Sequence, residues 1–522
     1  MIAAVALGRA VALASVTRLR ASGFEMVWST PKRVIRAVRG ATVEIDAELR
    51  NRSTDDMRGV ALRAVSSSML ETTISPTIID LPAESRVFVK VTIRTKRVGR
   101  WGLHGMALEV RGTPAGGEGL YEVPLMFANP FGVEVVPRAL KAMMDSPKGG
   151  RARRGAERGR PLNVPGEGDE LRELRDHVPG DAFKRIAWRA SAKRGKLVVR
   201  EMEHEHRDVV WLIVDASVEL WAGPEGEAPL DTVVDQVGAV AARYLSRGDR
   251  VGLAITASRL RTWLPPSSGS AQVAKVAAAL ASAASMVDAD RSDLDESDVA
   301  ARVAEHARPL DPTGLSDVAR GNLDALAARA DLLRARAPFA PRLPFASTAR
   351  ERTLRHYLAA FGIESAPRAE GESLKTSASL AAVLDRLARE KHKPTIAFVW
   401  APAPSMNASL AAAIRRMRNQ RTDIRWILST ASTTPMSDEG VEIETVRDAV
   451  DVAIAVRSKV GRIRGEAVLR RMGCKVQGIR GEKPAIRAHS EVDLQAEIPP
   501  SEPPDLQKQT RREPAPEYKE IV

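Results

Sequence analysis

The sequence offers little cysteine chemistry and few aromatic residues. Its 522 residues include one cysteine, Cys474, and aromatic residues make up 4% of the chain. A single cysteine excludes an internal disulfide and a CxxC metal site, so the chain fits a reducing compartment, or at least needs no oxidising one. Cys474 has no histidine close to it in the sequence, which predicts a buried small apolar side chain rather than a nucleophile.

Familiar catalytic motifs are also missing from the sequence. It contains no glycine-rich loop of the P-loop type, and the order of its serines, histidines and aspartates points to no nucleophilic triad. His204 and His206 would share one face of a strand. There they are either a candidate metal pair or part of an exposed edge strand of mixed charge. We therefore predict a protein that is not an enzyme.

The N-terminus lacks an apolar run of membrane-spanning length. Residues 2–16 are mostly apolar but are interrupted by Arg9, and they number about fifteen, whereas a membrane helix needs roughly 20. No basic region precedes the run, as it would in a signal peptide. Residues 1–25 are thus a short apolar segment, interpreted either as the remnant of a membrane helix or as an amphipathic or packed N-terminal helix.

Positive charge is what the chain has in excess. Its net charge is +13 and its pI is about 10, a balance that permits contact with nucleic acid or anionic lipid. Residues 147–160 read PKGGRARRGAERGR, which predicts a basic flexible linker over residues 141–165. Binding of nucleic acid or an anionic surface through this linker is an alternative function. We favour the simpler interpretation, an arginine-rich chain with a solvated linker.

Residues 26–140 show the alternation that is typical of half-buried β-strands. Val43, Ile45, Ala47 and Leu49 alternate with polar residues, and the run from residue 87 to residue 94 repeats the pattern. Several such strands separated by turn clusters predict an all-β sandwich of the immunoglobulin-like type, without a disulfide.

Residues 207–480 show a different rhythm. A continuous apolar run, Val209–Val214, ends in Asp215 and is typical of a strand buried on both faces. Helical and strand patterns then alternate, which predicts a doubly wound α/β domain. A charged, helical and proline-punctuated insertion over residues 286–372 interrupts it. Residues 481–522 lose apolar periodicity and are predicted to be a disordered tail.

Between these two regions lies a segment dense in both charge signs, residues 166–206, which we call the signature segment. Residues 168–203 read GDELRELRDHVPGDAFKRIAWRASAKRGKLVVREME. This stretch resembles the signature of the domain of unknown function 58 family, in order and without gaps. It departs at His177, where that family usually has Tyr, and at Lys184 and Lys193, where Arg is usual. The residues that carry the match are Arg172, Arg175, Gly180, Asp181, Lys184, Trp188, Ser191, Lys193, Arg200 and Glu201.

Two interpretations of the signature charges remain open. They form an interaction surface, or they form a partly buried ion-pair network that fixes the segment to the sheet. Upstream, the segments at residues 97–102 and 129–132 resemble stretches that precede the signature in the same family, with Asn129 in place of the usual Asp. The order of these segments therefore agrees with the resemblance.

The resemblance implies that a von Willebrand factor type A-like domain follows the signature segment. That fold binds a divalent cation such as Mg²⁺ at the carboxyl ends of its strands, and the matching residues here are Asp215, Ser217 and Glu219. Glu219 replaces a serine of the usual motif, and residues 401–404 offer no carboxylate. One alternative is a cation-dependent adhesion or hydrolysis site at Asp215. The other is a metal-free sheet in which Asp215 caps a helix or a turn.

The resemblance also implies a partner. Members of the family are often paired with a MoxR-type AAA+ ATPase in chaperone-like or complex-assembly roles, and they commonly carry membrane helices near the N-terminus. We therefore expect a non-catalytic interaction protein at the cytoplasmic face of the inner membrane, or in the cytoplasm if the N-terminus is complete.

Overall fold

The computed structural model describes most of the chain. The described residues are 24–54, 56–111, 120–145, 160–221, 223–316, 321–369, 371, 373–404, 408–429 and 446–478, together with five residues before residue 11. The predicted tail, most of the predicted segment 1–25 and residues 146–159 of the predicted linker lie outside them. Within the described part, no helix combines the length and the apolar character needed to cross a membrane.

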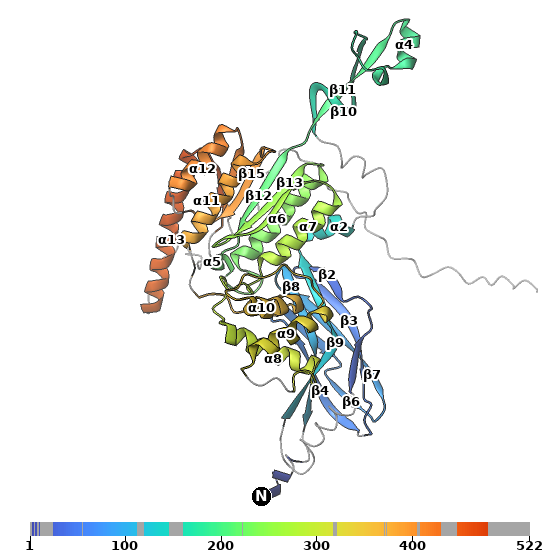
Figure 1. Cartoon of the computed structure of the whole chain (residues 1–522), viewed down its shortest axis with the longest axis vertical. Coiled ribbons are helices and arrows are strands. Elements are labelled where there is room, and N and C mark those ends of the chain that lie inside the picture. The colour runs from blue at the N-terminus through green and yellow to red at the C-terminus, as the bar shows by residue number, and fades with distance from the viewer. Residues whose placement is uncertain are drawn as a thin grey trace, which may run out of the picture. The chain divides into compact units, whose positions relative to one another are not determined.

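The N-terminal region consists of two antiparallel-rich sheets (Figure 1). One sheet has the order β1-β3-β7-β5, with strands Glu25–Trp28, Thr42–Arg50, Arg86–Thr95 and Leu70–Ser75. The other has the order β2-β9-β8-β4-β6, with strands Val34–Val38, Leu120–Val136, Gly99–Arg111, Met57–Ser66 and Ile78–Leu81. Side chains from both sheets belong to one core. The predicted all-β, sandwich-like character of this region is confirmed.

Alternation along the strands explains these two sheets. In β3, the side chains of Ile45, Ala47 and Leu49 are buried, while their polar neighbours stay partly or fully exposed. Paired strand β7 follows the same rule, with Val89, Val91 and Ile93 in the core. Because successive side chains in a strand point to opposite faces, each strand covers the core with one face only.

The C-terminal region is built on a six-stranded sheet with the order β14-β13-β12-β15-β16-β17. All neighbouring strands are parallel except β14, which runs antiparallel to β13. The strands are Leu260–Ser267, Arg250–Thr256, Val209–Asp215, Ile396–Ala401, Asp423–Leu428 and Lys475–Gly478. Helices α6 (Pro229–Ser246) and α7 (Ser270–Ala283) lie on one side of the sheet in Figure 1, and α11 (Ser373–Arg389), α12 (Ala408–Asn419) and α13 (Val446–Arg471) lie on the other.

The continuous apolar run of β12 follows from this three-layer arrangement. Val210, Leu212 and Val214 belong to the core that includes α6 and α7. Trp211 and Ile213 belong to the core that includes α11 and α12. Both faces are covered by helices, so no position of the strand needs a polar side chain. The predicted α/β class of this region is confirmed.

The helical insertion forms a third core of its own. Its helices are α8 (Glu296–Leu310), α9 (Leu323–Leu333) and α10 (Ala349–Phe361).

The insertion also contacts the N-terminal sheets. The carbonyl of Gly362 accepts hydrogen bonds from Ser67 Oγ at 2.5 Å and from Gly102 N at 3.1 Å. His306 Nε2 lies 3.1 Å from His104 Nδ1 of β8, and His306 Nδ1 lies 2.8 Å from the Tyr357 hydroxyl. Hence the insertion joins the two sheet regions.

Candidate functional site

The signature segment folds as an antiparallel pair of strands with a small structured end. Strand β10 (Arg160–Asp176) pairs with β11 (Val198–His206) (Figure 1). Between them lie a single 3-10 turn, η1 (Phe183–Arg185), and a short helix, α4 (Trp188–Arg194). We call residues 174–200 the head. The side chains of Arg172 and Glu201 lie outside the described ones, so the structure places only their backbone.

One half of the signature holds the first turn of the head together. Arg175 donates two hydrogen bonds to the carboxylate of Asp181, at 2.8 and 2.7 Å. Asp181 also accepts a hydrogen bond from the backbone N–H of Val178 at 2.9 Å. These bonds to Arg175 and Val178 hold the pKa of Asp181 well below its usual range. Gly180 has φ +106°, a conformation that favours glycine, so it allows the turn between them.

The second half of the signature is held together by hydrogen bonds of Ser191. Its hydroxyl donates to the Ala187 carbonyl at 3.0 Å and accepts from the Val198 N–H at 2.9 Å. It thereby connects helix α4 to the start of strand β11. Ile186, Ala187, Val198 and Val199 are buried around it. Arg175, Gly180, Asp181 and Ser191 therefore have structural roles in the head.

Other signature residues lie on the surface. Four large apolar side chains are exposed in the head: Phe183 by 75%, Trp188 by 61%, Val178 by 56% and Leu197 by 44%. Lys184 and Lys193 of the head are exposed as well. Within the described part of the chain, these two lysines take part in no ion pair, and the same holds for Arg189 and Arg194 of α4. Arg200 is exposed at the third position of β11.

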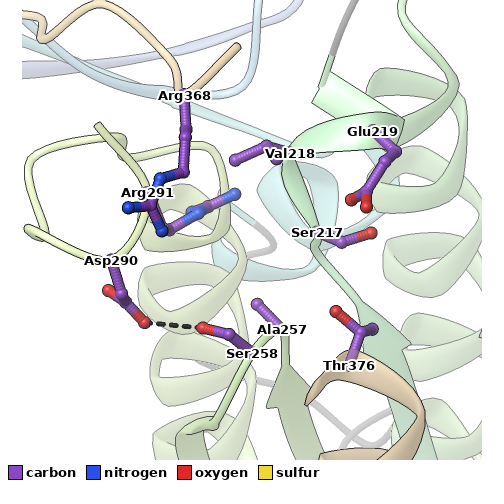
Figure 2. Close-up of a pocket in the computed structure, with 9 residues that line it drawn as sticks. All are labelled: Ser217, Val218, Glu219, Ala257, Ser258, Asp290, Arg291, Arg368 and Thr376. Carbon is purple, nitrogen blue, oxygen red and sulfur yellow. Dashed lines mark hydrogen bonds between the residues drawn. The ribbon is translucent and has the colours of Figure 1, made fainter. Parts of the chain in front are cut away.

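A second candidate site lies at the carboxyl ends of β12 and β13 (Figure 2). Asp215, the last residue of β12, is 3% exposed, and its carboxylate accepts a hydrogen bond from the Ser217 N–H at 2.9 Å. This contact is the turn-capping role that we had left open as an alternative. Burial raises the pKa of Asp215 to about 6, and nearby Glu219 raises it further whereas Ser217 and Arg291 lower it.

A small cavity of about 10 Å³ lies beyond Asp215, with room for about one water molecule. Figure 2 shows Arg291, Arg368 and Asp290 on one side of it, and Ser217, Glu219 and Thr376 on the other. The lining residues are Ser217, Val218, Glu219, Ala257, Ser258, Asp290, Arg291, Arg368 and Thr376. The predicted residues Ser217 and Glu219 are thus brought together at this edge, close to Asp215.

Arg291, which sequence reasoning missed, is the central cation of this edge. It is buried, and its guanidinium donates to the carbonyls of Ala283 at 2.8 Å, Ser285 at 2.6 Å and Ala216 at 2.5 Å. Burial holds the pKa of Arg291 below its usual value, followed in size by the effect of the neighbouring Arg261. The three carbonyl acceptors and the nearby carboxylates Asp288, Asp290 and Asp215 favour its charged form.

The acids beside Arg291 have partners of their own. Asp290 accepts hydrogen bonds from Ser258 Oγ at 2.8 Å and Arg259 Nε at 3.0 Å. Asp288 lies 3.1 Å from Arg259 and 2.5 Å from Arg261. Arg291 is thus the buried cation nearest to Asp215, while Glu219 lies on the opposite side of the cavity.

No group of three or more His, Cys, Asp or Glu side chains in the described part of the chain is arranged to hold a metal ion. The side chains of His204 and His206 are not among those described. Cys474 is buried just before β17, and burial raises the pKa of its thiol to about 11. A thiol with so high a pKa is a poor nucleophile at neutral pH.

Comparison with known proteins identifies a family for part of the chain. Residues 173–333 match the family described as "Protein of unknown function DUF58". Uncharacterized proteins of Mycobacterium tuberculosis and Mycobacterium bovis are 30% identical over 106 residues, which are 20% of this chain and 33% of each relative. The chain thus spans about a third of the length of these curated relatives. The predicted resemblance to the domain of unknown function 58 family is confirmed over the matched residues.

Similarities to solved structures are weak. The ASH/PapD-like domain 7 of human CEP192 is 14% identical, with 22% of this chain and 84% of that chain covered and a TM-score of 0.16. The E. coli chaperone DraB is 13% identical, with 35% of this chain and 83% of that chain covered and a TM-score of 0.14. Scores this low carry no argument about fold or function.

Proposed function

We propose that this protein is a non-catalytic interaction module that docks on a partner protein through the head of its signature segment. The observation that carries the proposal is the exposure of Phe183 and Trp188 in a small, internally bonded structure. Soluble proteins rarely leave several large apolar side chains together on the surface without a binding role. Tryptophan in particular is enriched among the residues that dominate binding energy at protein interfaces.

The interior of the head supports this proposal. Ile186, Ala187, Val198 and Val199 are buried, so the head has an apolar interior separate from its exposed side chains. The bonds made by Asp181 and Ser191 hold the backbone in place without using the exposed aromatic rings. A rigid support lowers the entropy lost on binding. The exposed rings are therefore presented by a pre-organised surface.

The charge around the rings favours an acidic partner. Lys184, Arg189, Lys193 and Arg194 are exposed on the same head and make its surface cationic. Charge complementarity of this kind raises the rate of encounter and excludes partners of like charge. The same cations also favour nucleic acid, but phosphate binding does not need four exposed aliphatic and aromatic anchors. A protein partner therefore explains more of the surface.

The resemblance of the signature supplies the identity of the proposed partner, a MoxR-type AAA+ ATPase, in a chaperone-like or complex-assembly role. We further propose that the C-terminal region is von Willebrand factor type A-like. This rests on its predominantly parallel sheet, the antiparallel edge strand β14 and the placement of Asp215 at the carboxyl end of β12. Association with the cytoplasmic face of the inner membrane stays part of the proposal, with a cytoplasmic protein as the alternative.

An affinity pulldown tests the docking surface. The full chain is used as bait for a MoxR-type ATPase of its own source organism, with and without Mg²⁺ and ATP. We expect Phe183→Ala/Trp188→Ala to abolish recovery, because truncation removes both aromatic anchors. The matched control is Phe88→Ala/Leu332→Ala, which removes side chains of similar exposure, 65% and 66%, outside the head. Absence of the ATPase from the wild-type pulldown, or equal loss with both double variants, would contradict the proposal.

A further inference from the structure

Three polar atoms around the cavity at the carboxyl edge are buried and have no hydrogen-bond partner. They are Glu219 Oε2, Asp290 Oδ1 and Arg291 Nε. Buried polar atoms without partners are few in native proteins, and each needs an explanation. Here the three atoms belong to residues that line a cavity with room for about one water molecule. The cavity is thus built for a single small polar occupant.

An A-type fold would place a divalent cation at this edge, so its donor set has to be tested against such an ion. Asp215 and Glu219 supply carboxylate oxygens, and Ser217 and Thr376 supply hydroxyls close by. Oxygen ligands of this kind suit Mg²⁺. In the same place, however, the guanidinium of Arg291 donates to the carbonyl of Ala216, the residue that follows Asp215. A buried guanidinium repels a dication at short range, because the low dielectric of the interior screens little.

The fixed charges also leave little for a dication to neutralise. Asp288 and Asp290 are paired with Arg259 and Arg261. That leaves Asp215 and Glu219 opposite the buried charge of Arg291, which its three backbone acceptors hold in place. The residues present therefore do not fit a divalent cation.

We infer that Arg291 is a built-in cation that takes the place of a divalent metal ion at the carboxyl edge of the parallel sheet, so that this edge works without metal. Its guanidinium, anchored on the carbonyls of Ala216, Ala283 and Ser285, supplies a fixed positive charge beside Asp215. The occupant of the cavity is then a water molecule, which its volume of about 10 Å³ fits. This inference does not depend on docking by the head.

Manganese binding tests the inference, since Mn²⁺ takes the oxygen ligands of Mg²⁺ and is detected directly by its magnetic resonance signal. The full-length wild-type chain is expected to show no saturable Mn²⁺ site, and its melting temperature is expected to be the same in Mg²⁺ and in a chelator. A single saturable site in the wild-type chain that disappears in Asp215→Asn would overturn the inference. This comparison needs no variant of Arg291.

Removal of the guanidinium is the complementary test. In Arg291→Ala this edge loses its buried cation, so we expect the variant to gain a Mn²⁺ site that Asp215→Asn then removes in the same background. Arg368→Ala is the matched control, because Arg368 lines the same cavity from the same side; it should gain no site. A folded Arg291→Ala that binds no Mn²⁺, or a gain equal to that of Arg368→Ala, would show that Arg291 does not hold the place of the ion.

Discussion

Arg97 and Asp231 form an ion pair that is almost completely buried, with Arg97 Nε 3.0 Å from Asp231 Oδ1. Arg97 precedes strand β8 of the N-terminal sheets, and Asp231 lies in the first turn of α6. The same carboxylate accepts a hydrogen bond from the Ala228 N–H at 3.1 Å, so it caps α6 while it binds the arginine. The guanidinium also lies over the ring of Trp221, 4.2 Å from its centroid. One carboxylate thus connects the two sheet regions.

The first prediction concerns this pair. Arg97→Met leaves the charge of Asp231 buried without its partner, and removal of one member of a buried pair costs about 3–5 kcal/mol. We expect a loss of that order in the free energy of unfolding, measured by urea denaturation. Lys96→Met is the control, because the pair of Lys96 with Glu225 joins the same two regions but is partly exposed, which limits its effect to about 1 kcal/mol or less. Equal losses would show that burial does not decide the effect.

The second prediction concerns Gly362. This residue has φ +69°, and a Cβ added to it would lie 2.6 Å from the backbone nitrogen of Gly102. Gly362→Ala therefore adds overpacking, which costs roughly 1–3 kcal/mol, to the strain of a left-handed alanine. Gly40→Ala is the control with φ +77° and open space around its Cβ. Denaturation of the two variants should show a larger loss in the free energy of unfolding for Gly362→Ala, because only that variant adds the contact to the strain. A smaller loss for Gly362→Ala than for Gly40→Ala would refute the assigned contact.

The third prediction concerns the buried histidines. Burial lowers the pKa of His104 to about 4 and lowers that of His306 well below its usual value. In the unfolded chain these two histidines take up protons near pH 6.5, whereas in the folded chain they stay neutral. The free energy of unfolding therefore falls as the pH drops below 6.5. One pKa unit corresponds to about 1.4 kcal/mol, so His104 alone should cost about 2 kcal/mol at about pH 5.

A double variant separates this effect from other titrating groups. His104→Leu/His306→Leu should lose less stability than the wild type between about pH 7 and about pH 5. Leucine binds no proton in either state, so these positions no longer contribute to the pH dependence. Urea denaturation at both pH values measures the difference. A pH dependence identical to that of the wild type would mean that the two histidines are protonated in the folded protein.

The fourth prediction concerns the salt dependence of docking. If the cationic head steers an acidic partner, the association rate should fall steeply between about 0.05 M and about 0.5 M salt, because added salt screens exposed charges. Lys184→Ala/Lys193→Ala should lower the association rate at low salt and change dissociation little. Surface plasmon resonance measures both rates. An association rate that does not respond to salt would indicate that only the apolar side chains recognise the partner.

Strands in which apolar residues recur in a regular pattern could be predicted from the sequence. The alternation in β3 and the continuous apolar run in β12 both correspond to strands. A strand buried on one face has alternating apolar residues, and a strand buried on both faces has a continuous apolar run. The short edge strand β17, Lys475–Gly478, has a single large apolar residue and was missed. Its position follows from pairing with β16, which no local pattern encodes.

The candidate site could be predicted only in part. Asp215, Ser217 and Glu219 were found because they match, at the end of a recognisable strand, the metal motif that the family resemblance implies. Arg291 was missed because its three partners are backbone carbonyls, one of them 75 residues away, and a carbonyl is the same in every sequence. The side chain of Arg175 was recognised as part of a signature, but its bond to Asp181 depends on a turn that the sequence did not reveal. Long-range and backbone partners therefore limit what residue patterns can show.

The hydrogen bond between Ser67 and the carbonyl of Gly362 has a consequence for synthesis on the ribosome. Its two residues are 295 positions apart, and at 5–20 residues per second the second follows the first by roughly 15–60 s. The N-terminal sheets are complete only when β9 has ended at Val136, and the 226 residues from there to Gly362 take roughly 11–45 s at the same rate. For that time the sheets lack the insertion that contacts His104 and Gly102. A nascent chain of this protein therefore carries a partly finished surface for many seconds, during which a chaperone has time to bind it.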